Sequence, residues 1–371
     1  MLAAFSVSAS GEYAQPPQTS AYAYSLYCAN NGEFIAGKNS GERLPMASTT
    51  KIMTAVLALE AEESGEVSSV RMSSDYYSEG SSMYLADGEA LSVHDIAGGM
   101  MMVSGNDAAN AIAVTLGGSI EGFAYKMNDK AASLGLDNTH FVNPSGLDSD
   151  GHFTTADDLC RLMAYCMENE SFAEIVGSRS ITAEFIEPSG KEQTYYNENK
   201  LLSRYEYCIG GKTGYTEKAG RTLVSCAEKD GVRLVCATLG DPDDWNDHEA
   251  LFEYGFSQLS AEIPVLEETD LKTAVAGGES DVVKCICSEA PQVVAGSKDV
   301  TIKYELPKFV YAPVKEGQKI GEAKYYTGGV YAGRSDITAE TSIAADKTET
   351  SFLENIASFF RSVASRIIKR K

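Results

Sequence analysis

The order of strand-like and helix-like segments constrains the fold of this chain more than any other feature. Residues 21–38 read as two alternating strands around an Asn-Asn-Gly turn, and residues 221–240 read as two further strands joined by Lys-Asp-Gly. Between these two pairs, and again after the second, the apolar periodicity is helical, over 48–63, 93–103, 106–116, 119–134, 155–167 and about 246–257. Strands at both ends with helices between them predict one mixed α+β domain, over residues 21–262, whose sheet joins segments distant in sequence.

The pattern changes after about residue 262. Short runs rich in Val, Ile and Tyr recur with Gly and Pro between them, as in KTAVAG, VTIKYEL and GEAKYY. We therefore expect a small all-β domain over residues 263–340, followed by a polar linker over 341–350.

Charge and metal-ligand spacing exclude several classes of function. The 371 residues carry a formal net charge of -22, which argues against a nucleic-acid partner, because such partners are held by clustered Lys and Arg. The eight cysteines form no Cys-x-x-Cys pair, and the four histidines show no His-Glu-x-x-His or His-x-His spacing. The sequence predicts neither a metal site nor a cofactor.

The start of the chain is similar to a secretory leader. Residues 1–20 open with a short apolar run followed by small residues, and Val7 and Ala9 occupy the positions expected before a cleavage site. No basic segment precedes the apolar run, so either the leader is truncated or the likeness is accidental; we favour the secretory interpretation. No run of about 18 apolar residues is present, so no membrane-spanning helix is predicted.

The last segment, residues 351–371, is amphipathic and basic. It places Phe352, Ile356 and Phe359 on one helical face and ends in Lys-Arg-Lys. This combination is typical of a helix that lies in an anionic membrane interface. We expect a protein secreted across the cytoplasmic membrane and anchored peripherally on its outer face; the alternative is a helix docked on its own domain or on a partner.

The stretch PMASTTKIM sets Ser48 three residues before Lys51 at the start of a predicted helix. Ser48 is in the position of a helix N-cap, whose hydroxyl would accept a hydrogen bond from a free amide. Residues i and i+3 also share a helix face, so the amine of Lys51 could take the proton of the Ser48 hydroxyl. This motif alone leaves both interpretations open.

Two further motifs follow in order and favour the chemical interpretation. Ser104-Gly105-Asn106 precedes a predicted helix, and Lys212-Thr213-Gly214 opens a strand region. A Ser-x-x-Lys motif followed by Ser-x-Asn and Lys-Thr-Gly marks the penicillin-binding proteins and class A β-lactamases. Three motifs in this order are a far more specific signal than any one of them.

The longer stretches LPMASTTKIMTA, SSMYLADGE, MMVSGNDAANAIA, NTHFVNPSGLD and GGKTGYTEKAG resemble the low-molecular-weight penicillin-binding proteins, the serine D-Ala-D-Ala carboxypeptidases of peptidase family S11. The resemblance is close over about residues 20–262, and the β-rich domain and terminal helix also look like that family's. It implies a β-lactamase/transpeptidase-like fold, with an antiparallel sheet and a helical cluster. It also implies removal of the terminal D-Ala from peptidoglycan stem pentapeptides, and β-lactam antibiotics as covalent inhibitors.

The expected site combines three catalytic residues with a substrate-binding set. Ser48 would attack the carbonyl, Lys51 would act as base if burial and the charge of Lys212 keep it partly neutral, and Ser104 would relay a proton to the leaving amine. Asn106 would hold Lys51 and the substrate amide. The strand from Lys212 through Thr213 and Gly214 would receive the substrate's carboxylate and peptide backbone, and the resemblance implies an oxyanion hole from the amides of Ser48 and Tyr215.

Other interpretations of this region remain. Ser104 could be only the N-cap of the helix that begins near Asp107. Arg221 could assist carboxylate binding, although Arg in a strand is more often on a solvated face. The acidic loop DPDDWND, residues 241–247, is predicted to be solvated.

Two competing functions are a β-lactamase and a non-catalytic wall-binding scaffold. A β-lactamase needs a Glu-x-x-Leu-Asn motif well upstream of Lys-Thr-Gly, whereas the nearest match, ENKLL at residues 198–202, ends in Leu and lies just before it. A scaffold with a vestigial site would be expected to have lost at least one motif residue.

Overall fold

The computed structural model describes residues 2–3, 13–264, 270–296, 299–346 and 356–357. The chain forms two compact units. The larger unit comprises Glu12–Ser260, and the smaller unit comprises Met1–Gly11 together with Ala261–Lys371.

A five-stranded antiparallel sheet lies at the centre of the larger unit, with the strand order β3-β2-β10-β9-β8. Its strands are β2 (Ala23–Cys28), β3 (Glu33–Lys38), β8 (Cys208–Thr216), β9 (Gly220–Lys229) and β10 (Val232–Leu239). The first strand pairs directly with β10, so that Tyr27 lies opposite Val235. This pairing confirms the prediction that segments distant in sequence join in one sheet.

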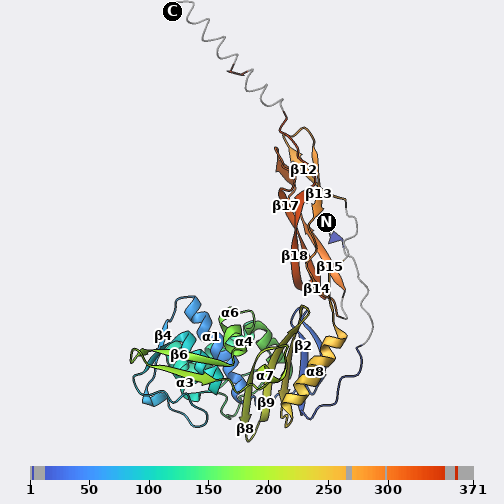
Figure 1. Ribbon diagram of the computed structural model, residues 1–371. Helices are drawn as coiled ribbons and strands as arrows, with labels where there is room; N and C mark the ends of the chain where they lie inside the picture. The colour runs from blue at the N-terminus through green and yellow to red at the C-terminus, as the bar shows by residue number, and fades with distance from the viewer. Residues whose placement is uncertain (1, 4–12, 265–269, 297–298, 347–355, 358–371) are drawn as a thin grey trace, which may run out of the picture. The chain divides into compact units, whose positions relative to one another are not determined.

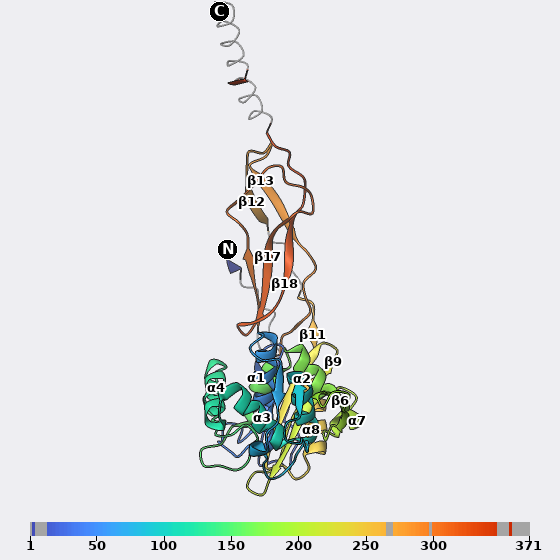
Figure 2. The ribbon, with the colours of Figure 1, turned by 90° about the vertical axis from the view of Figure 1, so that its left-hand side faces the viewer.

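Helices cover both faces of this sheet. The helices of the larger unit are α1 (Lys51–Glu63), α2 (Val93–Val103), α3 (Asn106–Gly117), α4 (Ile120–Ser133), α5 (Ala156–Cys166), α6 (Glu170–Gly177), α7 (Leu201–Arg204) and α8 (Asp244–Gln258). Helix α8 lies on one face, while α5 and the cluster of α1 to α4 lie on the other side (Figures 1 and 2). The helices predicted from periodicity are all present close to their expected ranges, and α1 to α6 contribute buried apolar side chains to one core.

A second, smaller sheet in the larger unit was not predicted. It has the order β4-β5-β6-β7, formed by β4 (Ser69–Arg71), β5 (Ala90–Ser92), β6 (Ser180–Glu187) and β7 (Glu192–Tyr196). Strands of three residues are too short to show an alternating pattern, which explains why β4 and β5 escape a periodicity search.

The smaller unit is built of strands, as predicted. A seven-stranded sheet has the order β1-β15-β17-β18-β13-β12-β16, and a separate pair joins β11 to β14. These strands are β1 (Leu2–Ala3), β11 (Ala261–Glu262), β12 (Leu271–Ala276), β13 (Val282–Cys287), β14 (Val293–Val294), β15 (Val300–Glu305), β16 (Phe309–Tyr311), β17 (Lys319–Thr327) and β18 (Val330–Ala339). Burial alternates along β13, β15 and β17, so one face of each strand contributes to an apolar core.

The pairing of the smaller unit extends beyond β18. Isolated bridges join Val314 to Ile343 and Gly278 to Ala345. Ile343 and Ala345 lie in the range 341–350 that was predicted to be a linker. Most of the predicted anchor lies outside the described residues, which include only 356–357 of the segment 351–371. In the described part of the chain, no helix combines the length and apolar character needed to cross a membrane.

Candidate active site

Ser48 lies in a tight turn at the foot of α1 and does not cap the helix. The turn is a 3-10 helix, η1 (Ala47–Thr50), and the N-cap residue of α1 is Thr50. The alternative interpretation of Ser48 as a helix N-cap is therefore wrong. Ala47, which precedes it, has a φ of 48°, a left-handed conformation that is strained for a residue with a Cβ. The turn leaves the Ser48 hydroxyl directed at the first residue of the helix.

Lys51 is that residue, and its ammonium is completely buried. Its Nζ lies 3.1 Å from Ser48 Oγ, and it donates to Asn106 Oδ1 at 2.7 Å and to the Ser145 carbonyl at 2.6 Å. Burial, followed by the positive charge of Lys212, holds the pKa of Lys51 well below its usual value. A lysine with a lowered pKa beside a serine hydroxyl can serve as a general base.

Ser104 and Lys212 form a second hydroxyl–amine pair. Lys212 Nζ donates to Ser104 Oγ at 3.2 Å and to the Thr213 carbonyl at 2.9 Å, and both side chains are buried. Burial lowers the pKa of Lys212 to about 8. Ser104 has a φ of 59° and ends α2, while Gly105 is the N-cap of α3, so the alternative role of Ser104 as an N-cap is wrong.

Asn106 connects Lys51 to a loop to which the sequence assigned no role. Its backbone amide donates to the Ser81 carbonyl, and its side-chain Nδ2 donates to the Glu79 carbonyl, both at 2.7 Å. The neighbouring Asp107 is buried and accepts from Met83 N and Ser82 Oγ of the same loop. The sequence did contain a signal for these contacts. Ser82 and Met83 lie in SSMYLADGE, and Ser145 lies in NTHFVNPSGLD, two of the stretches that resemble the family.

Strand β8 carries Lys212, Thr213 and Gly214 and brings Gly214 close to Ser48. The motif lies inside the strand rather than at its start. A Cβ on Gly214 would lie 2.8 Å from Ser48 N and 2.5 Å from Thr222 Oγ1, so only glycine allows this approach. Tyr215 follows with an exposed side chain, opposite Arg221 on β9.

A pocket of about 460 Å³ opens onto Ser48 and Ser104. Its wall includes the predicted residues Thr213, Gly214 and Tyr215, whereas Lys51, Asn106 and Lys212 are not among the residues that line it. It also includes residues to which the sequence analysis gave no role: Ser81, Glu198, Lys200 and Trp245. Ser48 and Ser104 thus border the open space, and each hydroxyl has the Nζ of a buried lysine within hydrogen-bonding distance.

The acidic loop beside this pocket, residues 241–247, was predicted to be solvated, but three of its aspartates are not. Asp241, Asp244 and Asp247 are all buried. Asp244 accepts a bidentate pair of bonds from Arg221 at distances of 2.6–3.1 Å, and the guanidinium of Arg221 lies 5.5 Å from the ring of Trp245. Asp244 begins α8, so the packing of that helix on the sheet brings the loop inward. Arg221 thereby joins the pocket wall.

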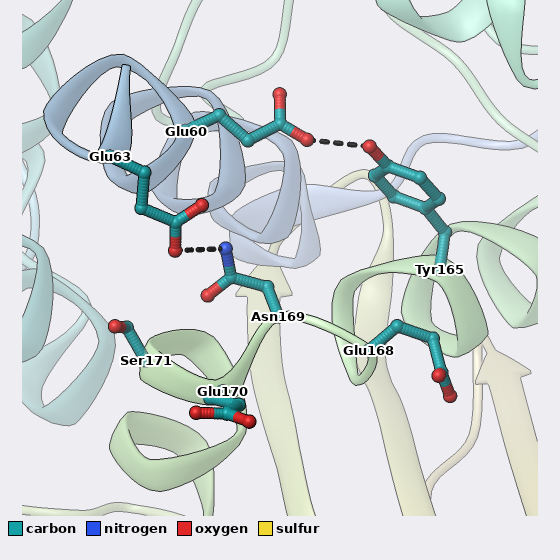
Figure 3. A pocket seen from close by; sticks show the side chains of 7 residues that line it. All are labelled: Glu60, Glu63, Tyr165, Glu168, Asn169, Glu170 and Ser171. Carbon is teal, nitrogen blue, oxygen red and sulfur yellow. Dashed lines mark hydrogen bonds between the residues drawn. The ribbon is translucent and has the colours of Figure 1, made fainter. Parts of the chain in front are cut away.

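A second cavity, of about 420 Å³, contains none of the predicted residues (Figure 3). Its polar groups already serve the fold: Tyr165 donates to Glu60 at 2.6 Å, and Asn169 donates to Glu63 at 2.8 Å while capping α6. Within the described residues, no group of three or more His, Cys, Asp or Glu is arranged to hold a metal ion.

Comparison with known proteins agrees with this geometry. The family profile described as D-alanyl-D-alanine carboxypeptidase matches residues 10–243, and the profile described as penicillin-binding protein 5, C-terminal domain, matches residues 265–345. The chain is 31% identical over 325 residues to D-alanyl-D-alanine carboxypeptidase DacF of Bacillus subtilis, with 84% of this chain and 82% of the relative covered. It is 38% identical over 238 residues to DacB2 of Mycobacterium tuberculosis, covering 62% of this chain and 79% of the relative.

A solved structure is similar over both units. Penicillin-binding protein 5 from Haemophilus influenzae superposes with a TM-score of 0.64 at 26% identity, covering 89% of this chain and 99% of that one. The family profile covers more than half of the chain, and the curated relatives are matched over most of their length. The chain therefore belongs to the D-alanyl-D-alanine carboxypeptidase family, peptidase family S11, and is a serine D-Ala-D-Ala carboxypeptidase of cell-wall metabolism.

Proposed function

We propose that Ser48 is the nucleophile that removes the terminal D-Ala from peptidoglycan stem pentapeptides. Ser48 Oγ attacks the carbonyl carbon between the two D-alanines, and its proton passes to the amine of Lys51. The amides of Ser48 and Tyr215 stabilise the resulting oxyanion. The C–N bond then breaks, D-Ala leaves as a free amine, and the rest of the peptide stays on Ser48 as an ester that water hydrolyses.

The remaining residues guide the proton and hold the peptide. Ser104, which accepts a hydrogen bond from Lys212, passes a proton to the leaving amine. Lys212 and Thr213 receive the terminal carboxylate, and β8 at the sheet edge offers backbone groups to an extended peptide along Gly214 and Tyr215. Asn106 fixes Lys51 and binds the substrate amide.

The observation that carries this assignment is the completely buried Lys51 Nζ, 3.1 Å from Ser48 Oγ. A buried amine with a lowered pKa is the group that a serine needs in order to lose its proton at neutral pH. If Ser48 served only as a helix cap, its hydroxyl would not need a buried amine beside it.

Two further parts of the proposal concern inhibitors and location. β-Lactams present a strained amide to the same pocket and acylate Ser48. The protein acts outside the cytoplasm, secreted with residues 1–20 as a leader, and it is held on the outer face of the membrane by residues 351–371. The support for location is the sequence pattern: Phe side chains on one face of the segment and a basic end.

The test is intact mass spectrometry of the purified protein incubated with penicillin, beside a Ser48→Ala variant. We expect a long-lived adduct of one penicillin on the wild type and none on Ser48→Ala, together with D-Ala release from a D-Ala-D-Ala peptide by the wild type only. Circular dichroism of both proteins shows that the variant is folded.

Other outcomes identify the competing functions. Rapid penicillin turnover without an adduct would indicate a β-lactamase, and neither adduct nor turnover would indicate a scaffold. An adduct that persists on Ser48→Ala would move the nucleophile to another residue.

A further inference from the structure

Glu198 lies on the wall of the active-site pocket, in a segment that is fixed to its surroundings. Its backbone amide donates to the carbonyl of Met102, near the end of α2 and two residues before Ser104. The two flanking asparagines hold the turn: Asn197 Nδ2 donates to the Ser178 carbonyl, and Asn199 Oδ1 accepts from Leu201 N. Glu198 is therefore presented at a defined place on the pocket wall, with an exposed side chain.

The carboxylate of Glu198 differs from the other carboxylate of the pocket. Asp244 is neutralised by the bidentate bonds from Arg221. Among the described residues, Glu198 forms no ion pair and no side-chain hydrogen bond, although it lines the same pocket as Ser48. Its negative charge reaches the site, because it raises the pKa of both Lys51 and Lys212 against the larger effect of burial.

From this arrangement we infer that Glu198 is a specificity-determining residue, whose carboxylate binds a cationic amine carried by the substrate peptide on the N-terminal side of its D-Ala-D-Ala end. The inference rests on the proposed function, in which Ser48 receives the scissile carbonyl and Lys212 and Thr213 receive the terminal carboxylate. With those ends fixed, the preceding residue of the peptide occupies the rest of the pocket, whose wall carries the unpaired anion Glu198 and, two residues along the same segment, the cation Lys200. An amine there gains a Coulomb partner, and an acetylated amine does not.

The experiment compares two synthetic peptides that differ only in one charge. Nα-acetyl-L-Lys-D-Ala-D-Ala keeps a free side-chain amine, and Nα,Nε-diacetyl-L-Lys-D-Ala-D-Ala does not. We expect the wild type to show a higher kcat/KM for D-Ala release from the free-amine peptide. Glu198→Gln should lower the ratio of the two kcat/KM values by about twofold to fivefold, the effect of an exposed ion pair. Glu198→Lys should lower it further.

Two controls separate direct recognition from indirect effects. Glu192→Gln removes one negative charge on β7 outside the pocket and should leave the ratio unchanged. The wild-type ratio itself should fall as salt is raised, which tests the ion pair without any substitution. A change in the pKa of Lys51 or Lys212 alone would alter kcat/KM for both peptides equally, because that effect does not depend on the side-chain amine of the peptide.

Three results would overturn the inference. The first is that Glu198→Gln leaves the ratio of the two kcat/KM values unchanged, and the second is that it lowers kcat/KM equally for both peptides. The third is that Glu192→Gln lowers the ratio as much as Glu198→Gln does. Each of these leaves D-Ala release by the wild type intact. Failure of the wild type to release D-Ala from either peptide would instead overturn the proposed function, so the two failures are distinguishable.

Discussion

The two units of the molecule differ in what they bury. The core of the larger unit includes charged side chains, among them Lys51, Lys212 and Asp107. In the described part of the smaller unit, the buried polar side chains are Thr273, Thr327 and Ser335, and none is charged. Burying a charge costs free energy unless other groups compensate it, so a unit without chemistry has no reason to do so. The difference agrees with the match of the carboxypeptidase family profile to residues 10–243, in the larger unit.

Buried charged side chains distinguish the two units, but they do not by themselves identify the functional residues. His248 is also completely buried, between Ser225 and Thr238, and burial lowers its pKa to about 3. It does not line the pocket. Lys51 differs from His248 because a serine that lines the pocket lies within hydrogen-bonding distance of its charge. A buried titratable group is therefore a signal of function only where it contacts a group that lines an open pocket.

The largest expected effect follows from removing the buried base. Lys51→Met keeps the volume of the side chain but has no amine to accept the Ser48 proton. We expect the rate of acylation by penicillin to fall by about 10²-fold to 10⁴-fold. The measurement is the second-order acylation rate, with a folded circular dichroism spectrum as the condition. Lys126→Met, at an exposed ion pair with Glu66, is the matched control and should leave the rate unchanged.

A substitution in the core of the smaller unit should lower stability and leave acylation unchanged. Tyr325 is completely buried there, and its hydroxyl lies 3.2 Å from Ser335 Oγ. Tyr325→Ala should cost about 3–5 kcal/mol of stability, by leaving a cavity in the core of this unit. Hydrogen exchange should become faster along β17 and β18, while acylation of Ser48 by penicillin keeps its rate. An equal loss of acylation would break the comparison, because it would make the smaller unit part of the chemistry.

Much of this contrast was predictable from the sequence, because it depends on local patterns. Helical periodicity placed α1 and α2, and three motifs in order named Ser48, Lys51, Ser104 and Lys212. Conformations set by tertiary packing were not predictable: Ser48 lies in a 3-10 turn, and Ser104 ends α2 in a left-handed conformation. Neither serine is a helix N-cap, although each occupies the position that local N-capping rules indicate.

The acidic loop shows a second limit of sequence reasoning. Four aspartates within residues 241–247 look solvated, because local composition records charge and not its partners. The partners come from elsewhere in the chain: Arg221 binds Asp244, and Ser20 donates to both Asp241 and Asp247. The carbonyl of Ser145 on Lys51 was missed for the same reason, since a backbone acceptor can be supplied by any residue type.

A smaller effect tests the close approach of β8 to the nucleophile. A Cβ at position 214 would lie 2.8 Å from Ser48 N, so Gly214→Ala must move the strand or the turn. A shift of this kind can lower acylation by about 10²-fold, with about 1–3 kcal/mol lost in stability. Gly41→Ala has no atom within 4 Å of the added Cβ and is the control. A variant Gly214→Ala with a normal acylation rate would show that the strand need not approach the serine so closely.

The smallest effect is the pH dependence, in which the lysines of the two units respond in opposite directions. Burial lowers the pKa of Lys212 from 10.5 to about 8, whereas carboxylate partners raise the pKa of the exposed Lys319 and Lys324 in the smaller unit. Lys212 is charged below about pH 8, so we expect kcat/KM for D-Ala release to fall as the pH rises through that value. In the proposed mechanism, the fall reflects loss of the cation that receives the terminal carboxylate.

The same shift has a consequence for stability, with the opposite sign. Between about pH 8 and 10.5 the unfolded chain binds more protons at Lys212 than the folded chain, so this residue makes unfolding less favourable as the pH rises. For Lys319 and Lys324 the folded pKa is the higher one, and their contribution is lost as the pH rises through it. The effect of Lys212 therefore falls between about pH 8 and 10.5, and that of Lys319 and Lys324 falls above 10.5, so kcat/KM and denaturant stability should be measured across both ranges. Lys212→Arg, which stays charged, should remove the alkaline fall in kcat/KM, and a fall that persists in this variant would assign the titration to another group.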